Sequence, residues 1–120
     1  MKHEKRLCGS FKTYVNEYGT HINVYYSEQT KAIPEGTPSD SPLIKEAEGE
    51  HVAKLTYHIS THSITIGKNI KEGYTAEDIA LEFASMMRTD WFRDYVKKVA
   101  NIDKVSKKPI WCKQLGKHFV

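Results

Sequence analysis

Residues 11–26, with the sequence FKTYVNEYGTHINVYY, contain two alternating patterns on either side of a short connection. In each pattern apolar and polar residues alternate, as in a strand that buries one face and exposes the other. The connection contains Gly19, and glycine readily supplies the left-handed backbone that a bulged hairpin turn needs. This stretch therefore predicts a β-hairpin.

A second alternating stretch covers residues 51–66. One face of it would carry Ala53, Leu55, Tyr57 and Ile59. Ile64 and Ile66 form another apolar pair at a spacing of two, and a turn at residues 60–63 would join the two parts. We expect a second hairpin here. One long strand with a bulge is the alternative.

The strongest single signal in the chain is a helix that starts after Thr75. Thr75 is a suitable N-cap residue, and Asp78 stands three positions on, as in a variant of the capping box. Apolar residues then follow at steps of three and four, namely Ile79, Phe83, Met86, Met87, Trp91, Tyr95 and Val99. We assign this stripe to the core. The helix is expected over residues 76 to about 101, either continuous or kinked at Thr89-Asp90.

Together these elements predict one α+β domain over residues 1–120: an antiparallel sheet of two hairpins, with about four to five strands, and one long or kinked C-terminal helix packed on one face. The other face of the sheet would stay open. Its expected residues are Lys12, Tyr14, His21, Asn23, Tyr25, Lys54, Thr56 and His58.

Two segments fall outside this pattern. Residues 27–49 contain Pro34, Pro38 and Pro42 and predict a long, Pro-rich acidic loop. The apolar pair Leu43-Ile44 would pin the middle of this loop to the core. Residues 103–120 form a basic tail, which is expected to be either a last short strand or an arm that docks on another subunit.

The charge of the chain is small but segregated. There are 18 Lys and Arg residues against 15 Asp and Glu, a net of +3, which is not by itself a nucleic-acid signature. Residues 28–50 carry six acids against two lysines, whereas residues 94–120 carry seven lysines against two acids. A basic surface with aromatic rings is typical of sites that hold phosphates and bases. The candidate ligand-binding residues are Arg88, Arg93, Lys97, Lys98, Lys104, Lys107, Lys108, Lys113, Trp111 and Tyr25, with Tyr26 as a further ring.

These features favour a small non-enzymatic binding protein for an anionic partner. The partner would be a nucleotide-like small molecule, a nucleic acid, or a protein or nucleoprotein complex that handles nucleic acid. In the last case the chain would act as an inhibitor or an adaptor. The first alternative is a homo-oligomeric protein–protein interaction module. It is suggested by the acidic Pro-rich loop, the Tyr-rich strands and the detachable tail.

The second alternative is an enzyme. His58-Ile59-Ser60 has the His-x-Ser pattern with which two-histidine phosphoesterases arrange a general acid, a general base and a phosphate-holding hydroxyl. The nearest second copy, His21-Ile22-Asn23, has Asn in place of the hydroxyl. His58, Ser60 and His21 are therefore weak catalytic candidates, and the sequence favours a binding role over enzymatic activity while leaving a small phosphoesterase as an alternative.

The cysteines and the N-terminus complete the expectations. Cys8 and Cys112 match no zinc-ligand spacing, so we expect neither a metal nor another cofactor. The polar start of the chain lacks the apolar region of a signal peptide, and no apolar run is long enough to span a membrane. These patterns predict a cytoplasmic protein with reduced thiols and no membrane partner.

Overall fold

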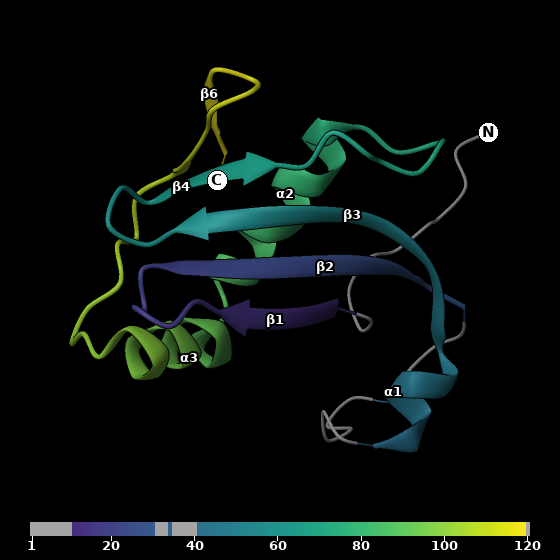
Figure 1. Ribbon diagram of the computed structural model, residues 1–120, viewed down its shortest axis with the longest axis horizontal. Helices are drawn as coiled ribbons and strands as arrows, with labels where there is room; N and C mark the ends of the chain where they lie inside the picture. The colour runs from purple at the N-terminus through teal and green to yellow at the C-terminus, as the bar shows by residue number, and fades with distance from the viewer. Residues whose placement is uncertain (1–10, 31–33, 35–40, 120) are drawn as a thin grey trace.

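The computed structural model describes residues 11–30, 34 and 41–119 (Figure 1). Over these residues the sheet has six strands, which lie side by side in sequence order. The strands are β1 (Phe11–Val15), β2 (His21–Gln29), β3 (Glu48–His58), β4 (Ser63–Ile66), β5 (Ile110–Cys112) and β6 (Lys117–Phe119). The helices are α1 (Pro42–Glu46), α2 (Ala76–Met87) and α3 (Asp90–Ala100). The α+β class is confirmed. The sheet is mixed rather than wholly antiparallel as predicted, it has six strands rather than four to five, and two helices rather than one follow β4.

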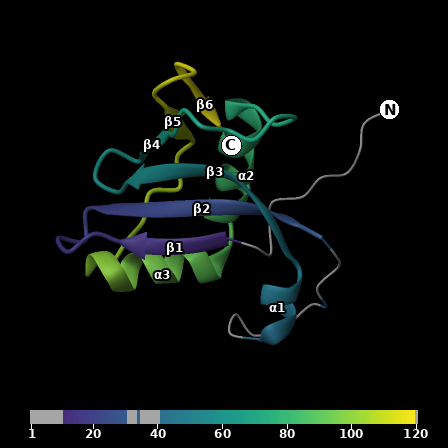
Figure 2. The same ribbon diagram turned by 45° about the vertical axis from the view of Figure 1, so that its right-hand side comes forward.

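Neighbouring strands are antiparallel except for β4 and β5, which are parallel. Parallel neighbours need a long crossover, and here the crossover contains α2 and α3. In Figure 1, α2 lies behind β3 and β4, and Figure 2 shows α3 beside β1. The sheet therefore has a helix-covered inner face and an outer face that the two helices leave uncovered.

Both predicted hairpins are confirmed by the register. In the first, Val15 pairs with Ile22, and Gly19 takes a φ of +67° in the turn. A Cβ atom at Gly19 would lie 3.0 Å from the carbonyl oxygen of Val99 in α3, so the turn needs glycine for space as well as for conformation. In the second hairpin, His58 pairs with Ser63.

The prediction of a long loop over residues 27–49 is partly wrong. β2 continues to Gln29 and β3 already begins at Glu48, so both strands extend beyond the alternating patterns at residues 11–26 and 51–66. Ser41 caps the short helix α1 by accepting a hydrogen bond from the backbone N–H of Leu43, and Pro42 occupies the first turn, where no N–H is needed. Leu43 is 47% exposed and does not pin the segment, and the side chain of Ile44 lies outside what the structure describes. Residues 31–33 and 35–40, including Pro38, lie outside the described residues.

The C-terminal helix is divided at Thr89. Thr89 has extended backbone, and its hydroxyl donates a hydrogen bond to the carbonyl of Met86 at 2.6 Å instead of capping α3. The break changes the helical phase, so Phe92 and Val96 are fully buried while Trp91 is 53% exposed. The assignment of Trp91 to the core was wrong for this reason. Upstream of the break, the predicted stripe from Ile79 to Met87 is confirmed.

The basic tail belongs to the sheet. Its β5 and β6 extend the sheet beyond β4, and Ile110 and Phe119 are buried in the common core with the two helices. Cys112 is buried and is not in a disulfide, and Cys8 lies outside the described residues. No helix within the described part of the chain has the length and apolar character needed to cross a membrane.

Candidate functional site

A pocket opens on the helix side of the molecule, between the end of α2, the start of α3 and the segment that leads into β5. Its apolar walls come from Ala84, Met87, Ile110 and Phe119. Its volume is about 130 Å³. A cavity of ~150 Å³ holds a molecule of the size of benzene, so this pocket accommodates one phosphate or carboxylate group rather than a whole nucleotide.

Four basic side chains line the same pocket. Arg88 and Arg93 come from the α2–α3 junction, and Lys107 and Lys108 come from the segment before β5. No acidic residue is among the described residues that line the pocket, and no described carboxylate forms an ion pair with Lys107 or Lys108. The pocket therefore combines a local excess of positive charge with an apolar wall.

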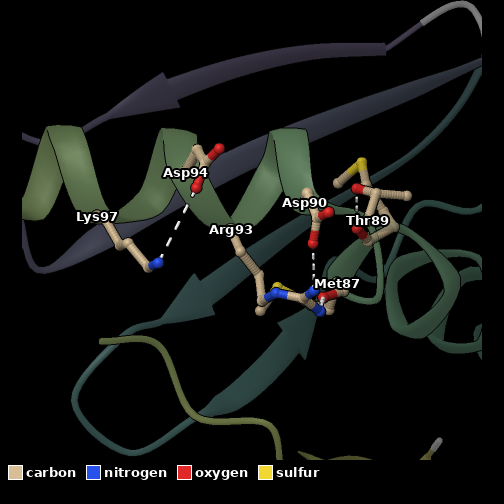
Figure 3. Close-up of polar contacts among 7 residues, drawn as sticks. Met87, Thr89, Asp90, Arg93, Asp94 and Lys97 are labelled. Atoms are coloured by element: carbon tan, nitrogen blue, oxygen red, sulfur yellow. Dashed lines mark hydrogen bonds and ion pairs between the residues drawn. The ribbon is translucent and has the colours of Figure 1, made fainter. Parts of the chain in front are cut away.

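Arg93 makes two polar contacts that link the start of α3 to the end of α2 (Figure 3). One guanidinium nitrogen donates to the carbonyl of Met87 at 3.0 Å, and another contacts Asp90 at 2.7 Å. The last turn of α2 has no basic residue of its own, so Arg93 satisfies a helix-terminal carbonyl there from the next helix. This arrangement holds the guanidinium at the pocket wall with its side chain only 21% exposed.

Arg88 and the two lysines are less constrained. Arg88 contacts the hydroxyl of Ser85 at 3.4 Å and is exposed, as are Lys107 and Lys108. The rim thus offers three adaptable cations beside one fixed guanidinium. Arginine matches the planar geometry of phosphate oxygens, and lysine acts as a mobile point charge.

His62 fixes the segment that carries the two lysines. Its Nε2 lies 2.7 Å from the carbonyl oxygen of Lys108, and its Nδ1 lies 2.8 Å from the hydroxyl of Tyr57. A carbonyl only accepts, so Nε2 carries the proton, and Nδ1 accepts from the Tyr57 hydroxyl. Burial lowers the pKa of His62, although the bond to Lys108 opposes this. The imidazole is therefore neutral near pH 7 and joins the sheet to the pocket rim.

The structure brings together four of the ten predicted ligand-binding residues. The other basic residues of the helix and tail, Lys97, Lys98 and Lys104, do not line the pocket, and Lys97 pairs with Asp94 at 3.9 Å. Lys113, Trp111 and Tyr25 are likewise absent from the pocket lining.

Tyr26 is fully buried and is unavailable as a stacking ring. His62 and the apolar wall were missed by the sequence analysis. The wall residues are ordinary core residues in sequence, and no motif marks His62 as their neighbour.

The weak catalytic candidates are only partly assembled. His21 and His58 are opposite each other on β2 and β3, with ring centroids 4.7 Å apart. His58 contacts the hydroxyl of Thr65 at 2.9 Å, and His21 contacts Thr20 at 2.7 Å. Ser60 lies in the turn after β3, with no hydrogen bond to either imidazole.

Among the described residues, no group of three or more His, Cys, Asp or Glu side chains is arranged to hold a metal ion. No protein-family model, curated protein or solved structure matches this chain.

Proposed function

We propose that this protein binds a small phosphate-bearing ligand, such as a nucleotide, through the basic pocket. The observation that carries the proposal is the convergence of Arg88, Arg93, Lys107 and Lys108 on one pocket from two separate segments. Scattered surface lysines would serve solubility alone, but four cations around an apolar wall favour an anion with an apolar or planar neighbour.

The size of the pocket defines the binding mode. A volume of about 130 Å³ accepts a terminal phosphate, so the remainder of a nucleotide-sized ligand would lie across the exposed rim. Arg93 would provide the fixed contact and the two lysines would close over the anion. His62 also lines the pocket, but both of its ring nitrogens are engaged, by the Tyr57 hydroxyl and the Lys108 carbonyl, so the proposal is binding and not turnover.

The test is calorimetric titration of the full chain with inorganic phosphate, pyrophosphate and nucleoside triphosphates at low and high salt. The pocket variant is Lys107→Ala/Lys108→Ala, which leaves the Lys108 carbonyl and its bond to His62 in place. The matched control, Lys98→Ala/Lys104→Ala, removes the same charge outside the pocket.

We expect the pocket variant to lose affinity by at least about tenfold, since a hydrogen bond to a charged group is worth ~1.5–3 kcal/mol. The control should keep most of the affinity. Equal losses in the two variants would show a general charge effect. If none of the phosphate probes binds at low salt, the proposal is wrong.

A further inference from the structure

We infer that the outer face of the sheet, opposite the helices, binds single-stranded nucleic acid. This inference concerns a second surface and does not depend on the pocket. The surface, called the outer sheet face below, runs from the cross-strand row Lys12–Tyr25–Lys54 to the row that begins with the His21–His58 pair.

The register places the outward side chains in continuous rows across the strands. The last row joins His21, His58, Ser63, Trp111 and His118 from five successive strands, and of these only Ser63 is buried, at 2% exposed. A middle row joins Tyr14, Asn23, Thr56 and Thr65. Cross-strand neighbours share one face, so these rows form a single surface.

Aromatic rings are spread across this surface. Tyr14 is 55% exposed and Trp111 is 37% exposed, and each has a ring neighbour that supports it. The Tyr14 and Tyr25 centroids are 5.6 Å apart, and those of Trp111 and His118 are 4.9 Å apart. Rings held in this way on a sheet offer flat faces on which unpaired bases stack.

Positive charge accompanies the rings. Lys12 and Lys54 flank Tyr25 in the register, and the Lys54 ammonium lies 5.6 Å from the centre of the Tyr25 ring. Lys113, just after β5, is near enough to His58 to add to the effect of burial in lowering its pKa. None of the outward positions in these rows is Asp or Glu. An acid-free surface of this kind is complementary to a phosphate backbone.

The polar groups between the rings are already oriented. The Thr56 hydroxyl donates to the Asn23 side chain at 2.8 Å, and His58 contacts Thr65 at 2.9 Å. Fixed amide, hydroxyl and imidazole groups can read the edges of bases that lie on neighbouring rings. These contacts favour a ligand that carries bases as well as charge.

The chemistry distinguishes single strands from other anions. A duplex keeps its bases stacked inside, out of reach of rings on a broad sheet, whereas a single strand can splay its bases. A lone phosphate would use few of these residues. Rings and cations spread over several strands fit an extended chain of nucleotides.

The test uses the fluorescence of Trp111. The chain has two tryptophans, so Trp91→Phe leaves Trp111 as the reporter. This protein is titrated with oligo-dT and oligo-U of about 15 nucleotides and with a duplex of the same length. We expect single strands to quench Trp111 emission, with affinity that falls steeply as salt is added. Comparing the affinities for oligo-dT and oligo-U shows whether the protein distinguishes DNA from RNA.

Binding of a labelled oligonucleotide is then measured by anisotropy for Trp111→Leu and for the matched control Trp91→Leu, which removes an exposed tryptophan from α3. Loss of one stacking ring should weaken binding by about tenfold in Trp111→Leu and leave Trp91→Leu near wild type. Circular dichroism confirms that each variant is folded. Tyr14→Leu, on the opposite edge of the face, gives an independent second reading.

Three results would overturn the inference: no quenching or anisotropy change at low salt, duplex binding as tight as single-strand binding, or equal losses in the two tryptophan variants. The pocket variant Lys107→Ala/Lys108→Ala separates the two proposals. If the outer sheet face is the site, that variant loses phosphate affinity and keeps oligonucleotide binding. If it alone abolishes oligonucleotide binding, the pocket holds the strand and the outer sheet face does not.

Discussion

The imidazole of His62, in the turn between β3 and β4, is hydrogen-bonded to the carbonyl oxygen of Lys108 at 2.7 Å, although Lys108 lies 46 residues further on, in the segment before β5. The backbone of His62 adds a second link, since its carbonyl accepts from the N–H of Trp111 at 3.3 Å. The turn after β3 thereby holds the segment that enters β5 at two points. The position of the pocket rim depends on this turn.

Replacing His62 with Ala should reduce the free energy of unfolding by about 1–3 kcal/mol, because the hydroxyl of the buried Tyr57 loses its acceptor. Urea denaturation measures the change. His51→Ala is the control, since His51 is exposed and, within the described part of the chain, its side chain has a ring contact with Tyr25 and no hydrogen bond. Equal destabilisation by both substitutions would contradict the proposed role of His62.

Stability should fall as the pH is lowered below the ordinary histidine pKa of 6.5. The pKa values of His58 and His62 are both lowered in the folded state, chiefly by burial. The unfolded chain therefore binds more protons just below pH 6.5, and the linkage favours unfolding until the pH passes the lowered folded values. Urea midpoints measured across this range should drop for the wild type and drop less for His62→Gln. An unchanged slope in that variant would exclude His62 as a source of the pH dependence.

The phase change at Thr89 predicts opposite effects for two adjacent residues. Phe92→Ala should cost about 3–5 kcal/mol because it opens a cavity in the core, whereas Trp91→Ala should cost much less because Trp91 is 53% exposed. Thermal and urea unfolding of the two variants compare them directly. A larger effect at Trp91 than at Phe92 would be inconsistent with two separate helices.

The start of α2 provides a local test. The Thr75 hydroxyl accepts from the N–H of Asp78, and the Asp78 carboxylate accepts from the N–H of Thr75. Thr75→Ala should therefore destabilise the protein by about 1 kcal/mol, and Thr75→Ser should restore most of the loss. Chemical denaturation with both variants makes the comparison. If the serine variant is as unstable as the alanine variant, the cap does not stabilise the helix.

The elements that sequence predicts well here are those set by local patterns. The hairpin around Gly19 follows from alternation and turn chemistry, and the start of α2 follows from Thr75 and Asp78. The break at Thr89 was foreseen only as an alternative, because the apolar steps from Met87 to Trp91 continue smoothly through it. The helical phase of α3 depends on which of two neighbouring side chains, Trp91 or Phe92, packs into the core. Tertiary contacts decide this, and they bury Phe92.

The candidate site needs long-range information. Arg88 and Lys107 come together only because β5 pairs in parallel with β4, and a three-residue strand such as Ile110–Cys112 carries too short a pattern to reveal that pairing. The outer sheet face was partly predicted, because the register places on it all eight residues that were expected there: Lys12, Tyr14, His21, Asn23, Tyr25, Lys54, Thr56 and His58. Its extension to Trp111 and His118 required the register of β5 and β6.

The parallel pairing of β4 with β5 also determines the order in which the chain can assemble during synthesis. Short turns join β1 to β2 and β3 to β4, and all four strands pair in sequence order, so they can form as soon as they leave the ribosome. The edge of β4 stays open until both helices and β5 have been made, and an open edge invites pairing with another chain. The pocket is therefore the last part to be completed. A chain released before residue 106 would retain its hairpins, lack the pocket rim and be prone to aggregation.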